Sequence, residues 1–271
     1  MNTSDPPVPA ARKAIPRPPL SRTGKPAPWA HLPVEGRCGI TLERVMGALA
    51  ADRADRTDRA DRADRADRAD RGQSGSPEPW RSLSGEAVDG RPAAVLVPLF
   101  EQDGETRVIL TVRSDRLRSH RGEVAFPGGR LDPGEEVAEG ALREAHEEVG
   151  LDPGLVTVVA ALTAMPTVSS NTVMTPVVAT LEGRPSLVAN PDEVDRVFDV
   201  ALSELVAAHA FHEERWSVPG RRHLSDLADG EFPVWFFEVA GETVWGATAR
   251  TLVELLCLVL EVRVPTSLQS P

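Results

Sequence analysis

The residues best suited to chemistry lie in one short segment, 129–151. Its polar and conformationally special positions stand at fixed spacing: Gly129, Glu135, Arg143, Glu144, Glu147, Glu148 and Gly150. Glu144, Glu147 and Glu148 stand at positions i, i+3 and i+4, which share one side of a helix. Their carboxylates repel one another unless a cation lies among them, and a dense set of oxygen ligands suits Mg²⁺ or Mn²⁺, not zinc. The spacing therefore predicts a divalent-cation site; the alternative is a charged, solvated helix face.

A helix over residues 137–149 is expected to position these carboxylates. Small or apolar side chains recur along it every four residues, at Val137, Ala141, Ala145 and Val149. This spacing marks one buried face, and Gly150 is a typical C-cap residue. The preceding loop is rich in residues that expose backbone, namely Pro127, Gly128, Gly129, Pro133 and Gly134. Backbone N–H groups in such a loop can approach phosphate oxygens closely.

The segment resembles the box of the Nudix hydrolases, which reads Gly, five residues, Glu, seven residues, then Arg-Glu-apolar-any-Glu-Glu-any-Gly-apolar. Every fixed position is met, with Ala145 and Leu151 at the apolar sites. The resemblance implies that Glu144, Glu147 and Glu148 bind Mg²⁺ or Mn²⁺. It also implies that Glu135 and Arg143 orient these carboxylates, and that the site hydrolyses a nucleoside diphosphate linked to another moiety.

Residues 110–129 resemble the coenzyme A pyrophosphatase branch of this family. The motif of that branch is met at Leu110, Thr111, Arg113, Ser114, Arg118, Gly122, Phe126, Pro127, Gly128 and Gly129. Coenzyme A carries a diphosphate and a 3′-phosphate, and guanidinium groups suit such oxyanions. We expect Arg113 and Arg118 to contact phosphate, with His120, Gly128 and Gly129 also at the substrate. The alternative for any of these arginines is that it is a surface charge, or that it pairs with a nearby acid such as Asp115 or Glu123.

For coenzyme A, the resemblance implies the products 4′-phosphopantetheine and adenosine 3′,5′-bisphosphate. A cation at the carboxylate cluster would lower the pKa of a bound water, which attacks one phosphorus in line. The general base stays open: Glu147 or Glu148 can serve, and so can an acid from another loop, such as Glu182 or Glu193.

Three alternative functions stay open. The first is hydrolysis of another nucleotide, such as ADP-ribose, NADH or a nucleoside triphosphate. The second is a Nudix module that senses a nucleotide without cleaving it, and the third is an interaction protein that works through the repeat described below.

One departure from the motif of the branch bears on the identity of the substrate. Members of the branch often carry Ser-Gly-aromatic where this chain has Ser169, Ser170, Asn171 and Thr172.

The remaining pattern predicts an α/β protein, a Nudix-type α/β/α sandwich with a mixed sheet. Strands are expected over residues 92–100 and 106–113, joined by a turn at 101–105, and over 155–162, 172–181, 232–239 and 242–244. Residues 165–181, 190–205 and 243–260 continue the resemblance to the branch. A C-terminal helix is expected over residues 247–262. We place the Nudix hydrolase domain at residues 90–265.

The N-terminal third is expected to form a largely disordered extension. Residues 1–37 are rich in proline without apolar periodicity, and so predict a disordered tail. Residues 38–50 predict a short amphipathic helix. Residues 51–89 comprise an Ala-Asp-Arg repeat and a flexible linker, and the repeat holds seven Asp-Arg dipeptides. Such a tract cannot build a core; it forms either a solvated helix with i,i+4 ion pairs or a disordered linker.

Composition limits the partners of the protein. The net charge of −11 argues against nucleic acid or an anionic membrane as the main partner. Cys38 and Cys257 form no ligand pattern and suit reduced thiols in a cytoplasmic protein. No apolar run suits a secretion signal or a membrane span. We therefore expect a cytoplasmic enzyme that binds a small-molecule substrate, and allow for a homodimer.

Overall fold

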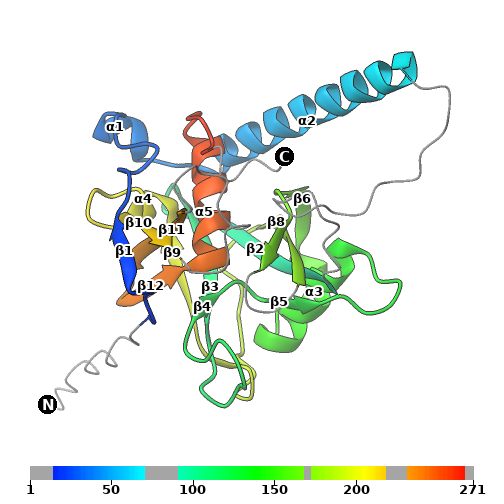
Figure 1. Cartoon of the computed structure of the whole chain (residues 1–271). Helices are drawn as coiled ribbons and strands as arrows, with labels where there is room; N and C mark the ends of the chain where they lie inside the picture. Colours follow the sequence, from blue (N-terminus) through cyan, green and yellow to red (C-terminus); the bar gives the residue numbers. More distant parts are fainter. Residues whose placement is uncertain (1–14, 71–90, 168–171, 218–230, 266–271) are drawn as a thin grey trace, which may run out of the picture.

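An eight-stranded sheet lies at the centre of the computed structural model, which describes residues 15–70, 91–167, 172–217 and 231–265 (Figure 1). Five strands follow the order β4 (Val124–Ala125), β3 (Glu105–Arg113), β2 (Arg91–Gln102), β8 (Thr172–Leu181) and β6 (Thr157–Ala161). Three further strands pair with these: β5 (Gly128–Arg130) with β2, β7 (Met165–Thr167) with β8, and β9 (Val194–Ala201) with β3. Because β2 and β8 run parallel and the other pairs antiparallel, the sheet is mixed, as predicted.

Helices pack on both faces of this sheet. The side chains of β2 alternate: Leu96 and Phe100 contact one apolar cluster, whereas Val97 and Leu99 contact another. The first cluster contains the buried face of α3 (Val137–Val149), and the second contains that of α5 (Gly246–Val259). Alternation with a period of two residues sends neighbouring side chains to opposite faces of a strand. The α/β/α sandwich is thereby confirmed.

The predicted hairpin joins β2 to β3 through a two-residue turn. Asp103 and Gly104 have φ values of 55° and 76°, the left-handed conformations that a type I′ turn requires. The later strands also form, and the expected C-terminal helix ends slightly earlier, at Val259. The same part of the chain contains two short helical turns, η1 (Pro153–Leu155) and α4 (Leu202–Leu205).

Part of the N-terminal tail that was expected to be disordered forms a strand of a second, four-stranded sheet. Its order is β1 (Leu20–Thr23), β10 (Phe211–Ser217), β11 (Phe232–Val239) and β12 (Glu242–Trp245). The disorder predicted for residues 1–37 is therefore wrong from residue 20 onward. The edge of β10 supplies backbone partners for β1, and Trp29, 1% exposed, stacks on Phe237. Neither contact produces periodicity in the sequence. Residues 1–14 lie outside the described residues.

The Ala-Asp-Arg repeat is helical, which is one of the two expected alternatives. After the short α1 (Val34–Arg37), a single 29-residue helix, α2 (Leu42–Asp70), takes in the expected amphipathic helix from residue 42 onward and continues through the repeat to Asp70. Residues 38–41 of the expected helix are not helical. Figure 1 shows its C-terminal half projecting away from the sheets. Arg56 makes the expected i,i+4 ion pair with Asp52 at 2.6 Å and also pairs with Glu254 of α5 at 2.9 Å. The predicted linker, 71–89, lies outside the described residues.

Two observations bear on expectations from composition. Neither cysteine is paired: Cys38 is exposed and Cys257 is buried. Among the described residues, no helix is long and apolar enough to cross a membrane.

Candidate active site

Helix α3, which packs on one face of the large sheet, carries the predicted carboxylates. At its start the backbone N–H of the N-cap residue Glu136 donates to the side chain of Glu139 at 3.3 Å, and the helix ends at Gly150 with φ 66°. Ala141, Ala145 and Val149 are buried against β2 and β8. This packing fixes the rotation of the helix, so Glu144, Glu147 and Glu148 occupy defined positions beside its buried face.

The loop before α3 approaches these carboxylates closely. A Cβ atom on Gly129 would lie 2.5 Å from the carboxyl carbon of Glu144, closer than real Cβ contacts. Gly128 has φ 154° and donates its backbone N–H to Glu148 at 3.1 Å. Glycine is required at position 128, because a Cβ there would collide with the backbone carbonyl oxygen of Ala94 and the φ value is positive. At position 129 a side chain would instead displace the carboxylate of Glu144. The loop and helix form one compact unit.

Arg143 connects the carboxylates of this unit. Its Nε donates to Glu135 at 2.8 Å, and its Nη1 donates to Glu144 at 3.0 Å and to Glu147 at 3.1 Å. Nη2 donates to the backbone carbonyl of Arg130 at 3.0 Å. The hydrogen bond to Arg143 is the main cause that lowers the pKa of Glu135. Arg143 thus joins Glu135, Glu144 and Glu147 in one hydrogen-bonded group.

Glu148 is the most buried of the three candidate ligands, with 2% of its surface exposed. Burial raises its pKa to about 7, opposed by the hydrogen bond from Gly128 and by the charge of Arg113. The Nη1 of Arg113 lies 3.5 Å from Oε1 of Glu148. A buried carboxylate with a raised pKa beside a guanidinium is a typical feature of a functional site.

A fourth carboxylate, that of Glu193, acts on the same cluster. Burial is the main cause that raises the pKa of Glu144 and of Glu148, and the negative charge of Glu193 raises both further. Its loop is tied to the site, because Asn190 donates its backbone N–H to the carbonyl of Glu148 at 2.8 Å. By contrast, no interaction within the described part of the chain joins Glu182 to the cluster. Of the two loop acids considered from the sequence, only Glu193 acts electrostatically on the cluster.

The donor set is chemically suited to a hard divalent cation, which prefers carboxylate oxygens. Mutual repulsion already disfavours the charged forms of Glu144 and Glu148, and a cation would relieve it. Glu147 is the most exposed of the three glutamates. Its side chain is 52% exposed, and its Oε2 pairs with Arg143. Within the described residues, accordingly, no three acidic, histidine or cysteine side chains are arranged as a ready-made metal site. Glu144 is likewise bonded to Arg143, at 3.0 Å, so binding of one cation by all three glutamates would require their side chains to rearrange.

The arginine motif lies on the other side of Glu148. Arg113 ends β3 at a register shift against β9, and a bulge of this kind redirects a side chain. Its guanidinium pairs with Glu148, and no ion pair among the described residues joins it to Asp115 or Glu123, although its backbone N–H donates to the carbonyl of Glu123 at 3.0 Å. His120, with φ 55°, bonds Glu123 at 2.9 Å; this bond is the main cause that raises its pKa, and the charge of Arg113 lowers it. Arg118 is exposed on the same loop.

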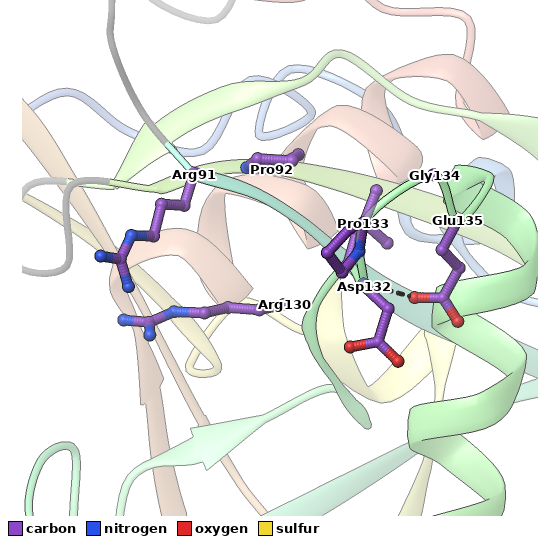
Figure 2. A pocket seen from close by; sticks show the side chains of 8 residues that line it. Arg91, Pro92, Arg130, Asp132, Pro133, Gly134 and Glu135 are labelled. Carbon is purple, nitrogen blue, oxygen red and sulfur yellow. Dashed lines mark hydrogen bonds between the residues drawn. The ribbon is translucent and has the colours of Figure 1, made fainter.

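A cavity of about 410 Å³ lies beside the loop that precedes α3, and the sequence did not indicate it. Figure 2 shows Arg91 and Arg130 on one side of this cavity, with Asp132 and Glu135 on the other. The altered segment Ser169–Asn171 lies outside the described residues, and Thr172 begins β8.

Comparison with known proteins identifies the family of this unit. A family profile of the NUDIX domain matches residues 90–220. The chain is 37% identical over 180 residues to the Nudix hydrolase NudL of Photorhabdus laumondii, an alignment that covers 66% of this chain and 89% of the relative. It is 44% identical over 116 residues to Nudix hydrolase 3 of Caenorhabditis elegans, which covers 42% of this chain and 48% of the relative. The chain thus spans about half the length of the latter.

A third relative carries a substrate in its name. The peroxisomal coenzyme A diphosphatase NUDT7 of Mus musculus is 36% identical over 173 residues, covering 62% of this chain and 70% of the relative.

Proposed function

The chain belongs to the Nudix hydrolase family, and we propose that it hydrolyses the diphosphate bond of coenzyme A or its derivatives. One observation carries the proposal: Arg113, from the motif before the box, lies 3.5 Å from Glu148 in the box. The guanidinium of Arg113 and the carboxylate of Glu148 thus lie together. The guanidinium can bind a phosphate while the carboxylate binds a cation beside it. The likeness to the mouse coenzyme A diphosphatase supports the choice of substrate.

Nudix hydrolases use divalent metal ions such as Mg²⁺ or Mn²⁺, and we assign the metal ligands of this chain to Glu144, Glu147 and Glu148. When bound there, the cation supplies charge neutralisation of the diphosphate and activation of the attacking water. Glu135 and Arg143 act as positioning residues, since Arg143 bonds Glu135, Glu144 and Glu147. The N–H of Gly128 holds the carboxylate of Glu148 in place.

The reaction itself needs a group that accepts a proton. The oxygen of water adds to one phosphorus, the bridging phosphoanhydride bond breaks, and one proton of the water passes to a carboxylate. Glu147, Glu148 and Glu193 are the candidates. Glu193 is attractive because it acts on the cluster from a separate loop, outside the proposed ligand set. The products are 4′-phosphopantetheine and adenosine 3′,5′-bisphosphate.

Substrate recognition falls to the loop that follows β3. Arg113 contacts the diphosphate, Arg118 extends the positive surface, and His120 lies within electrostatic range of Arg113. The backbone of Gly128 and Gly129 lets phosphate oxygens approach the cluster without a side chain in the way. We place the activity in the cytoplasm, as the sequence predicts.

Product analysis tests this proposal. Purified protein is incubated with Mg²⁺ or Mn²⁺ and, separately, coenzyme A, ADP-ribose or NADH, and the products are resolved by chromatography. The proposal expects adenosine 3′,5′-bisphosphate from coenzyme A at the highest kcat/KM. Faster cleavage of ADP-ribose or NADH would contradict the choice of substrate but retain the Nudix chemistry. No cleavage of any of these would favour the non-catalytic, nucleotide-sensing alternative.

A further inference from the structure

Two arginines lie side by side at the cavity in front of α3. Arg91 begins β2 and Arg130 ends β5, and the antiparallel register pairs Ala93 with Arg130. Arg91 is therefore a diagonal neighbour of Arg130 on the same face of the sheet, a relation that long side chains can bridge. Figure 2 shows both guanidinium groups extending to the same side of the cavity.

The charge of this pair is not compensated by the acids nearest to it. Both arginines are exposed, and within the described residues neither guanidinium makes a hydrogen bond or an ion pair. The acids of the same cavity face Arg143 instead: Glu135 lies 2.8 Å and Asp132 3.9 Å from its Nε. Like charges at neighbouring cross-strand positions repel each other. An anion held between the two guanidinium groups would turn this repulsion into attraction.

We propose that Arg91 and Arg130 form an anion site that binds a phosphate group, either a phosphate monoester or a free phosphate ion. A guanidinium presents parallel N–H donors that match two oxygens of one phosphate, and two such groups can hold a dianion from both sides. The cavity beside the pair, about 410 Å³, leaves room for a phosphate and part of the group that carries it.

This anion site is separate from the carboxylate cluster but adjacent to it. Gly129 packs against the Glu144 carboxylate, and Arg130 is the next residue of β5. Because successive residues of a strand point to opposite faces, the side chain of Arg130 points away from the face on which Gly129 meets Glu144. Its carbonyl accepts a hydrogen bond from Arg143, which ties the two places together. The phosphate can belong to the substrate, as a second anionic group away from the diphosphate, or be a free phosphate ion.

A direct binding measurement tests the site itself. Inorganic phosphate is titrated by calorimetry into the full-length protein in EDTA, for the wild type, Arg91→Gln and Arg130→Gln. Arg53→Gln is the control: it removes the same charge from an exposed position on α2. We expect saturable binding that weakens about tenfold or more in either cavity variant and not in the control. Absence of saturable binding, or unchanged affinity in Arg91→Gln and Arg130→Gln, overturns the proposal.

A kinetic comparison identifies the source of the phosphate, and it alone rests on the proposed function. Coenzyme A and dephospho-coenzyme A differ only in the 3′-phosphate. If the substrate supplies the anion, Arg91→Gln raises KM for coenzyme A about tenfold and leaves kcat and the KM for dephospho-coenzyme A unchanged. If a free phosphate ion occupies the site, both KM values stay unchanged while phosphate binding is lost. Failure to cleave either substrate counts against the proposed function, while the titration still decides on the site.

Discussion

The Nη1 of Arg113, at the end of β3, lies 3.5 Å from Oε1 of Glu148, in the last turn of α3. The side chain of Glu148 is 2% exposed and that of Arg113 is 24% exposed. The arginine can therefore reach both solvent and the buried carboxylate. This contact links the motif that we propose to bind phosphate to the proposed metal ligands.

Substitution Arg113→Ala is expected to lower kcat/KM for coenzyme A by about 10- to 100-fold, the cost of losing charge-assisted hydrogen bonds to phosphate. It should also raise the pKa of Glu148, since the charge of Arg113 holds that pKa down. The acidic limb of the pH profile of kcat/KM should then move to higher pH. Arg116→Ala is the control, because Arg116 follows Arg113 on the same loop but pairs with the exposed Asp192 instead of Glu148. If the pH profile of Arg113→Ala equals that of the wild type, the charge of Arg113 does not act on the pKa of Glu148, and the prediction is wrong.

The raised pKa of Glu148 predicts how stability depends on pH in the metal-free protein. Below about pH 4.5 this carboxyl is protonated in the folded and unfolded chains alike. As pH rises toward the folded-state pKa of about 7, the unfolded chain loses the proton first, and stability falls. Substitution Glu148→Gln should therefore stabilise the protein by about 3 kcal/mol at pH 8 and have little effect at pH 4.

Urea unfolding in EDTA at both pH values measures this difference. Glu261→Gln is the control, because Glu261 is exposed and lies outside the site. Equal stability of Glu148→Gln and wild type at pH 8 would show that Glu148 has an ordinary pKa.

Gly129 is predicted to set the position of the Glu144 carboxylate, because a side chain at residue 129 would displace it. In Gly129→Ala the new Cβ would lie 2.5 Å from the Glu144 carboxyl carbon, so this proposed ligand must move. We expect kcat to fall on the order of 100-fold and the half-saturating metal concentration to rise. Gly183→Ala is a matched control, because nothing lies within 4 Å of a Cβ at that position. The measurement is a metal titration of activity; equal curves for the two variants would contradict the close approach.

Part of this architecture was predictable because it is written in local spacing. The four-residue repeat of small side chains predicted α3 with its observed bounds, and the same spacing placed Arg143 near the glutamates. The turn at Asp103 and Gly104 was likewise predictable from its position between two apolar runs.

Other parts depend on pairing between distant segments, which leaves no local signal. The register of β2 against β5, which brings Arg91 beside Arg130, cannot be inferred from either strand alone. The same holds for β1 on β10, and for the loop that brings Glu193 to the cluster. Only the folded arrangement shows these neighbours.

The Ala-Asp-Arg repeat is predicted to contribute to stability through one residue. Arg56 lies 2.9 Å from Glu254, which is 2% exposed and also accepts hydrogen bonds from the N–H and hydroxyl of Thr163. Because Arg56 is partly exposed, Arg56→Ala should cost about 1–2 kcal/mol, less than the loss of a partner from a fully buried pair. Arg53→Ala, at an exposed position of the same repeat, should change the free energy of unfolding by less than about 0.5 kcal/mol. Indistinguishable urea midpoints for the two variants would refute this role for Arg56.

The central claim is that the carboxylates of α3 form the catalytic centre of a coenzyme A pyrophosphatase. Its most direct test is kcat for coenzyme A in Glu148→Gln, measured with saturating Mg²⁺ or Mn²⁺, with circular dichroism to verify the fold. The account predicts a loss on the order of 1,000-fold or more, since the substitution removes a proposed metal ligand without changing its size. A folded variant that retains most of the wild-type kcat would contradict it.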